Sequence, residues 1–217
     1  MMFLVVATGA AVGWSIDRVT PWILKRVFNT EDLRPAPGYP RVAAMLGAVI
    51  AGATCWAYGM SWEMLWGQAA GLMLLALGSI DVRAMLLPDV LVYPLLWTGL
   101  LFHAVFQPEL LSESVFAVVI WYSLPLATGT LFQWWRGYPG MGHGDFKLMA
   151  ALAAWLGFDS MPWVVVSAAI LMITIWLVMR YHLRCQTNKA LTLAPFGAAL
   201  TFTGWCAIIS QPYMTAV

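Results

Sequence analysis

Two aspartates, Asp81 and Asp145, stand in contexts that could support catalysis. Asp81 ends a long apolar run, and Asp145 follows a glycine-rich stretch that begins at Gly140. Two carboxyl groups a few ångströms apart cannot both ionise, so such a pair shares one proton. The ionised member can take a proton from water while the protonated member donates to a substrate carbonyl. This arrangement would hydrolyse a peptide bond without a metal, a thiol or a serine.

The residues next to Asp145 support this hypothesis to different degrees. Gly142 and Gly144 carry no side chains, so a peptide could approach the carboxylate closely. Lys147 is interpreted as a cytoplasmic anchor or as a charge partner of Asp145, and not as a catalytic residue. His143 is interpreted as a solvated loop residue.

The composition indicates that a membrane surrounds these residues. Of the 217 residues, 62% are hydrophobic and 10% are charged, whereas a soluble domain has about a quarter charged residues. A lipid bilayer is therefore the expected partner of the apolar surface. The net charge is +1 without a basic block, so we expect no nucleic-acid partner.

Apolar runs predict an all-α fold, a polytopic transmembrane bundle of about eight helices forming one membrane domain over residues 1–217. The first run is expected to be a retained membrane segment and not a removed signal. The sixth is short, and we expect it to pack against its neighbours. The predicted helices are Met2–Trp14, Val42–Met60, Met64–Ile80, Leu86–Phe106, Ser114–Trp134, Leu148–Phe158, Pro162–Met179 and Leu191–Ile209.

The basic residues predict the orientation of this bundle. All 11 Lys and Arg residues fall in the connections that follow the first, third, fifth and seventh predicted helices. Cytoplasmic connections are rich in Lys and Arg, so this side is expected to face the cytoplasm and both termini the periplasm. Asp81 and Asp145 lie on the cytoplasmic side. The charged residues of the opposite side are all acidic, namely Glu63, Glu109, Glu113 and Asp159.

The longest polar stretch, residues 17–41, predicts a cytoplasmic loop with a short interfacial helix around Trp22–Phe28. The three cysteines form no CxxC pair, so we expect neither a zinc site nor a disulfide framework. They are Cys55, Cys185 and Cys206.

A single aspartate at a helix end is usually a capping or solvated residue. Asp89, which follows Pro88, is expected to cap the helix that starts near Leu91. From the residues alone, the sequence therefore indicates a membrane protein with two notable aspartates, Asp81 and Asp145.

Two separate motifs sharpen this interpretation. Asp81 is followed after six residues by Pro88-Asp89, and a glycine-rich motif, Gly142–Leu148, lies further along the chain. Together they resemble the type IV prepilin peptidases, also called type 4 leader peptidases, whose pattern is an Asp, six residues, Pro-Asp, and a distant GxGD-[FV]-K. The resemblance extends over residues 39–197 and includes Ala194–Gly197.

The resemblance implies an aspartic endopeptidase of the bacterial inner membrane with Asp81 and Asp145 as its catalytic pair. Pro88, Asp89, Gly142, Gly144 and Lys147 would support the motifs, within a peptidase core over residues 78–197. The implied partner is a prepilin or pseudopilin, cut after a glycine and before an apolar helix. No metal or other cofactor is expected for this reaction, and the sequence does not indicate an oligomeric state.

The chain departs from the full-length family pattern in one respect. Full-length members carry a larger cytoplasmic domain with two CxxC pairs and an N-methyltransferase activity, whereas residues 17–41 are short and lack cysteine. N-methylation of the mature pilin, with S-adenosylmethionine as cofactor, therefore stays open as an additional activity.

Three other functions share some of these features. A transporter could use an intramembrane acid pair, but transporters place such groups near the bilayer midplane and often show internal repeats. A protease of the presenilin type shares the GxGD motif but lacks the Pro88-Asp89 context. A non-catalytic assembly protein would not require both Asp81 and Asp145.

Overall fold

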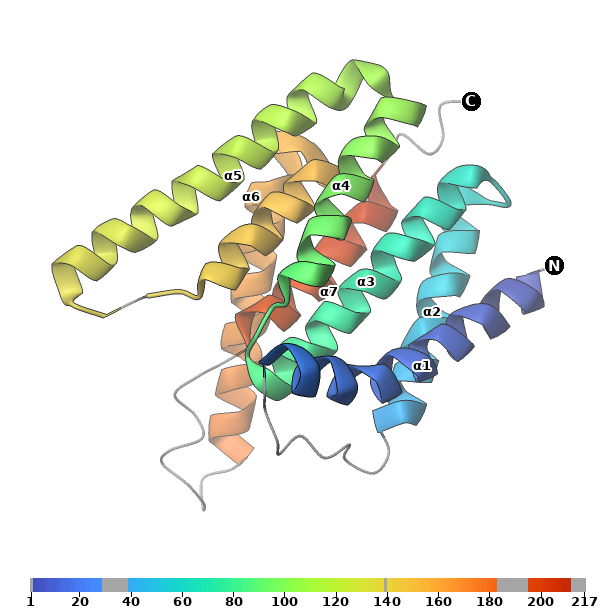
Figure 1. The fold of residues 1–217 in the computed structure, drawn as a ribbon, viewed down its shortest axis with the longest axis horizontal. Coiled ribbons are helices and arrows are strands. Elements are labelled where there is room, and N and C mark those ends of the chain that lie inside the picture. Colours follow the sequence, from blue (N-terminus) through green and yellow to red (C-terminus); the bar gives the residue numbers. More distant parts are fainter. Residues whose placement is uncertain (1, 29–38, 139, 183–194, 212–217) are drawn as a thin grey trace.

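The structure, a computed structural model, describes residues 2–28, 39–138, 140–182 and 195–211 (Figure 1). Within these ranges the regular structure is entirely helical, which confirms the predicted all-α fold. The helices are α1 Met2–Phe28, α2 Tyr39–Tyr58, α3 Trp62–Ala84, α4 Asp89–Phe106, α5 Pro108–Arg136, α6 His143–His182 and α7 Phe196–Ser210.

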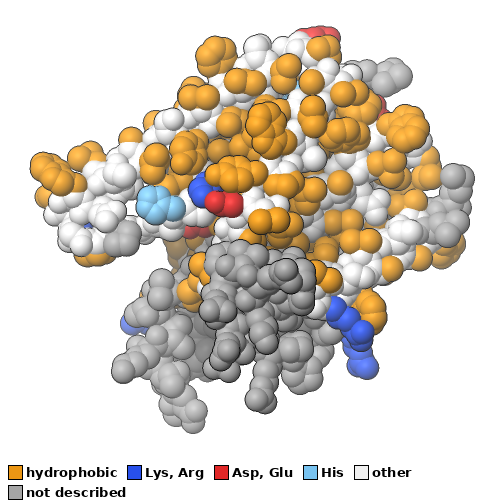
Figure 2. Space-filling model, in the orientation of Figure 1, with side chains coloured by type: hydrophobic (Ala, Val, Ile, Leu, Met, Phe, Trp, Pro, Cys, Tyr) orange, Lys and Arg blue, Asp and Glu red, His pale blue; other side chains and the backbone are white. Residues whose placement is uncertain are grey.

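The surface of this bundle suits a lipid environment. In the described part of the chain, five helices (α2 to α6) are long and apolar enough to cross a membrane, and α7 is a shorter apolar helix. Large apolar side chains point outward, among them Trp97 at 61% and Phe116 at 68% exposure. Hydrophobic side chains dominate the face in Figure 2, with few charges between them. These features are those of a multi-pass membrane protein.

A break at Gly157 separates the predicted sixth and seventh helices. They are joined in α6, but Gly157 has φ 70° and ψ −171°, a conformation that is not helical. Glycine adopts positive φ without the steric penalty of a Cβ atom. The predicted division is therefore confirmed, although the two halves follow one another without a loop.

The predicted boundaries of the first helix and of the cytoplasmic loop were wrong. Helix α1 continues from Met2 to Phe28, so residues 17–28 belong to it and do not form a separate interfacial helix. Helix α2 already begins at Tyr39, and residues 29–38 lie outside the described part. An apolar run shows where the hydrophobic side chains end, whereas a helical backbone continues into polar surroundings as long as its own hydrogen bonds form.

The first half of α6 forms the centre of the bundle. Residues 148–156 are all buried, and this half lies among α4, α5 and α7 (Figure 1). Trp155 stacks on Phe102 with ring centroids 5.3 Å apart, and its indole Nε1 donates a 2.9 Å hydrogen bond to the carbonyl of Leu95. The expectation that the short sixth helix packs against its neighbours is confirmed, and this packing fixes the start of α6 relative to α4.

Helices α1 and α2 approach one another through glycines. A Cβ atom added to Gly47 in α2 would overlap the backbone oxygen of Gly9 and lie 3.1 Å from the Cα of Gly13, both in α1. Small residues allow this approach in membranes, where packing replaces much of the hydrophobic driving force between helices.

We predict that Gly47→Ala lowers the melting temperature of the purified protein in detergent, because the added methyl group must separate α1 from α2. Gly52→Ala in the same helix is the matched control, since no heavy atom lies within 4 Å of its added Cβ. This control should be neutral or slightly stabilising, as alanine favours a helix by up to about 1 kcal/mol over glycine. Equal melting temperatures for the two variants would contradict the close packing of α1 on α2.

Candidate active site

Asp81 lies in the last turn of α3 and is 5% exposed. Its helix ends at Met85, which has a left-handed conformation with φ 51° and donates its N–H to the Asp81 carbonyl at 2.8 Å. A left-handed residue commonly ends a helix, although a non-glycine residue rarely occupies that position. This turn sends the chain through Leu87 and Pro88 into α4.

The Asp81 carboxylate is held by the start of α7. Its Oδ2 accepts a 2.7 Å hydrogen bond from the N–H of Ala198, in the first turn of that helix. The first N–H groups of a helix have no partner within it and carry a partial positive charge, so they favour an anion. Gly197 permits the approach, because a Cβ there would lie 2.9 Å from the same Oδ2 atom.

Asp145 lies in the first turn of α6 and is half-buried. Its backbone N–H donates to the carbonyl of Gly142 at 3.1 Å. The residue before Asp145, Gly144, lies against Leu87, and Leu87 also lies against Gly197, which is next to the Asp81 carboxylate. The fold therefore brings the two aspartates singled out in the sequence to one location.

Leu87 lies between the start of α6 and the start of α7. A Cβ added to Gly144 would lie 3.0 Å from the Cβ of Leu87, and one added to Gly197 would lie 3.0 Å from its Cδ1. The leucine therefore contacts both α6 beside Asp145 and α7 beside Asp81.

The two glycines of the GxGD motif have unequal steric roles. A Cβ on Gly144 would meet Leu87 at a distance that forces a small shift, whereas one on Gly142 would meet only Asp145 Oδ2 at an ordinary 3.6 Å. Gly142 is exposed at the surface. The structure thus assigns the tighter packing to Gly144 and leaves open space beside Gly142.

Lys147 and Asp89 form an ion pair that joins α6 to α4. The Lys147 Nζ donates to both oxygens of Asp89, at 2.8 and 2.7 Å, and also lies 5.7 Å from the centre of the Tyr93 ring. Of the two interpretations of Lys147, the pairing with Asp145 is therefore wrong, because its carboxylate partner is Asp89. The prediction that Asp89 caps α4 is also wrong, because the extended Pro88 occupies the cap position and Asp89 is the first helical residue.

The remaining predicted residues lie around this location with lesser roles. Pro88 is buried and ends the turn between α3 and α4. The His143 side chain is exposed, and its ring packs edge-on against Phe146, 5.9 Å away. The sequence reasoning missed the contacts of Leu87 and the amide of Ala198. Gly197 lies in the run Ala194–Gly197 that the resemblance included, which was the one signal pointing to this part of α7.

No group of three or more histidine, cysteine, aspartate or glutamate residues that could hold a metal occurs in the described ranges. Cys55 and Cys206 carry free thiols there, and Cys185 lies outside the described residues.

Comparison with known sequences places the chain in a family. The sequence profile of the type IV leader peptidase family matches residues 68–177, which include both aspartates. The chain belongs to this family.

Several curated relatives of the type IV leader peptidase family match the chain over most of its length. Each bears the name prepilin leader peptidase/N-methyltransferase. The protein of Stutzerimonas stutzeri is 35% identical over 184 residues, covering 82% of this chain and 60% of the relative. The protein of Pseudomonas aeruginosa is 34% identical, covering 79% of this chain and 58% of the relative. The protein of Neisseria gonorrhoeae is 36% identical, covering 77% and 56%.

The chain thus spans about 60% of the length of these relatives. No solved structure gives a significant match.

We predict that Asp89→Asn and Lys147→Met each lower the melting temperature slightly, and that the double variant loses less than the sum. The side chains are 48% and 26% exposed, and pairs near the surface contribute roughly 0.2–1 kcal/mol. Thermal unfolding of the four proteins in one detergent measures this coupling. Strictly additive losses would mean that the ion pair does not hold α4 to α6.

Proposed function

We propose that this protein is a membrane-embedded aspartic endopeptidase that removes the N-terminal leader from a type IV prepilin or prepilin-like protein. Membership of the type IV leader peptidase family supports the substrate class. The observation that supports the mechanism is that Leu87 lies against both Gly144, next to Asp145, and Gly197, next to the Asp81 carboxylate. A pair of neighbouring carboxyl groups can supply both the acid and the base of peptide hydrolysis.

In the proposed mechanism, Asp81 is the ionised member of the pair. The hydrogen bond from the Ala198 N–H and the start of α7 favour a negative charge on its Oδ2. Asp81 takes a proton from the attacking water as the hydroxide oxygen bonds to the scissile carbonyl carbon. Asp145 donates its proton to the carbonyl oxygen. When the carbon–nitrogen bond breaks, Asp81 gives its proton to the leaving amine. Asp145 takes a proton back from a hydroxyl group of the tetrahedral carbon, which becomes the product carboxyl, so the pair again shares one proton.

The reaction is proposed to take place at the cytoplasmic face of the bacterial inner membrane. Asp81 and Arg83 lie in the last turn of α3, Asp145 and Lys147 lie near the start of α6, and Arg136 ends α5. Basic connections stay in the cytoplasm. A leader that remains in the cytoplasm would therefore meet the two aspartates where the bilayer ends.

Methylation of the new N-terminus is a second candidate activity, because the relatives are named as both leader peptidase and N-methyltransferase. The peptidase reaction proposed above uses only Asp81, Asp145 and water. S-adenosylmethionine would be required for the second activity alone. The mass of the mature pilin N-terminus distinguishes the two, since an added methyl group increases that mass.

We predict that Asp81→Asn and Asp145→Asn each reduce prepilin processing by roughly 100-fold or more, the usual contribution of a catalytic acid or base. The test is co-expression with candidate prepilins from the same genome, with the mature N-terminus measured by mass spectrometry. The variants should accumulate in the membrane at the level of the unmodified protein, because asparagine preserves the shape of the side chain. Near-normal cleavage by either variant would refute the two-aspartate mechanism.

We also predict that Gly197→Ala and Gly142→Ala have unequal effects on the rate of cleavage. Gly197→Ala should strongly reduce cleavage, because its Cβ would lie 2.9 Å from Asp81 Oδ2 and displace the carboxylate from the Ala198 amide. Gly142→Ala should stay within a fewfold of the unmodified enzyme, because its added Cβ makes only an ordinary contact. The reverse order of activities would contradict the proposed position of Asp81. Initial rates at matched protein levels provide the measurement.

A further inference from the structure

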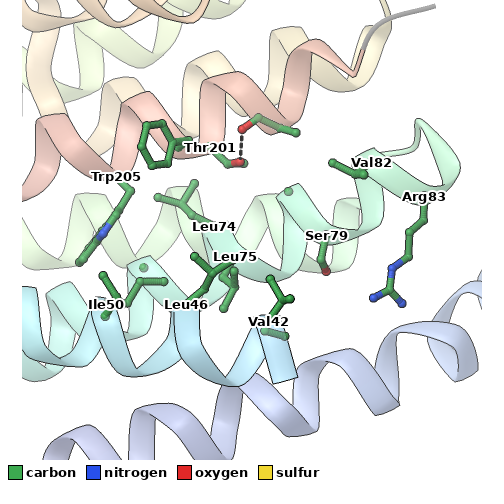
Figure 3. Close-up of a pocket in the computed structure, with 16 residues that line it drawn as sticks. Val42, Leu46, Ile50, Leu74, Leu75, Ser79, Val82, Arg83, Thr201 and Trp205 are labelled. Carbon is green, nitrogen blue, oxygen red and sulfur yellow. Dashed lines mark hydrogen bonds between the residues drawn. The ribbon is translucent and has the colours of Figure 1, made fainter. Parts of the chain in front are cut away.

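An apolar groove of about 300 Å³ lies between α2, α3 and α7 (Figure 3). Its walls include Val42, Leu46 and Ile50 from α2, Leu74 from α3, and Trp205 from α7. The groove has the size of a small ligand pocket, for which a typical range is about 300–1,000 Å³.

One end of this groove adjoins Asp81. Ala198, whose amide holds the Asp81 carboxylate, lines the groove, and so do Val82 and Arg83 directly after Asp81. The other end lies at Gly71, where an added Cβ would lie 2.8 Å from the Trp205 ring. The rise of an α-helix makes the distance along α3 from Gly71 to Arg83 about 18 Å. The groove therefore leads from the candidate catalytic pair toward the interior of the membrane-spanning region.

The groove can be reached from the side of the bundle. Leu46, Val82 and Phe202 line it and are 45%, 50% and 59% exposed. No wall of the described protein separates these side chains from the surroundings of the bundle, which for helices of this composition is lipid. A segment that already lies in the membrane could therefore enter without passing through water.

The lining determines the chemistry of the occupant. The hydroxyl groups of Ser79 and Thr201 donate to the carbonyls of Ala76 and Ala198, each at 2.8 Å, so both donors are used within the bundle. Arg83 is the charged residue of the lining and lies at the Asp81 end. A polypeptide segment at this depth must be apolar and must satisfy its own backbone hydrogen bonds, which in a membrane requires a helix.

We propose that this groove holds the apolar helix of the substrate that directly follows the cleaved bond. This inference rests on the proposed function and adds the binding site of the membrane-embedded part of the substrate. The continuity of the groove with the Ala198–Asp81 contact carries it, because a helix lying along α3 would present the residue at its cytoplasmic end to Asp81. Binding of the helix in lipid would thus position the scissile bond, and cleavage would depend on apolar residues beyond the leader.

The test compares Leu46→Trp with Leu101→Trp. Both leucines are about half exposed, at 45% and 50%, but Leu46 lines the groove and Leu101 lies on α4 away from it. The probe is a synthetic peptide in phospholipid vesicles: a basic leader ending in glycine, followed by an apolar helix of about 20 residues, the length that spans a bilayer. A shortened peptide keeps only a few residues after the glycine.

With the long peptide, Leu46→Trp should raise KM roughly tenfold, the effect of losing one buried apolar side-chain contact, whereas Leu101→Trp should match the unmodified enzyme. The KM penalty of Leu46→Trp should shrink with the shortened peptide, because the blocked contact is then missing in both enzymes. A photoreactive residue placed in the apolar helix, two turns after the cut, should crosslink to α2, α3 or α7.

Two results would overturn the groove proposal while leaving the proposed function intact. One is cleavage of the long peptide with equal KM for both tryptophan variants. The other is crosslinking that misses α2, α3 and α7. Crosslinks to lipid alone would make the groove a site for acyl chains, and crosslinks to other helices would place the substrate helix elsewhere on the bundle. Failure of the unmodified enzyme to cleave either peptide would refute the proposed function itself, and the groove proposal with it.

Discussion

The contact between the Ala198 amide and the Asp81 carboxylate is the interaction on which the rest of the site depends. A buried carboxylate is costly unless hydrogen bonds compensate for the lost water, and the free N–H groups at the start of α7 supply that compensation. The contact requires α3 to end close to α7, which the left-handed Met85 permits. It also requires a residue without a side chain at Gly197. The last helix of the bundle is thus as necessary for the position of Asp81 as the helix that carries it.

The other aspartate is positioned by packing. The first half of α6 is buried among α4, α5 and α7, so Asp145 at its start has little freedom to move relative to those helices. Leu87 fills the space between the α6 and α7 starts, and the Lys147–Asp89 ion pair ties α6 to α4 at the surface. One carboxyl group is therefore held by a hydrogen bond and the other by the rigidity of a packed core. A groove that begins beside Ala198 extends this arrangement into the apolar part of the bundle.

Predictions from local patterns were right where the membrane requires a helical backbone. They were wrong for features set by polar residues, namely the end of α1 and the ion-pair partner of Lys147. The helical fold could be predicted, because a membrane requires helices. A division of α6 was also predicted, but after Phe158, whereas the break lies at Gly157. The end of α1 could not be predicted, because its helix continues past the apolar residues. The ion-pair partner of Lys147 could not be predicted from the sequence either. The nearest acid in the sequence is Asp145, but the nearest in space is Asp89, on another helix.

The sequence by itself determined the membrane character, the helical class, the two candidate aspartates and the family to which their motifs belong. These depend on composition and on local spacing, which a linear chain displays directly. Only the tertiary structure decided that Asp81 meets the amide of Ala198, that Leu87 lies against the neighbours of both Asp81 and Asp145, and that an apolar groove opens beside them. Contacts between distant segments follow from how whole helices pack, and packing depends on all the side chains of an interface together.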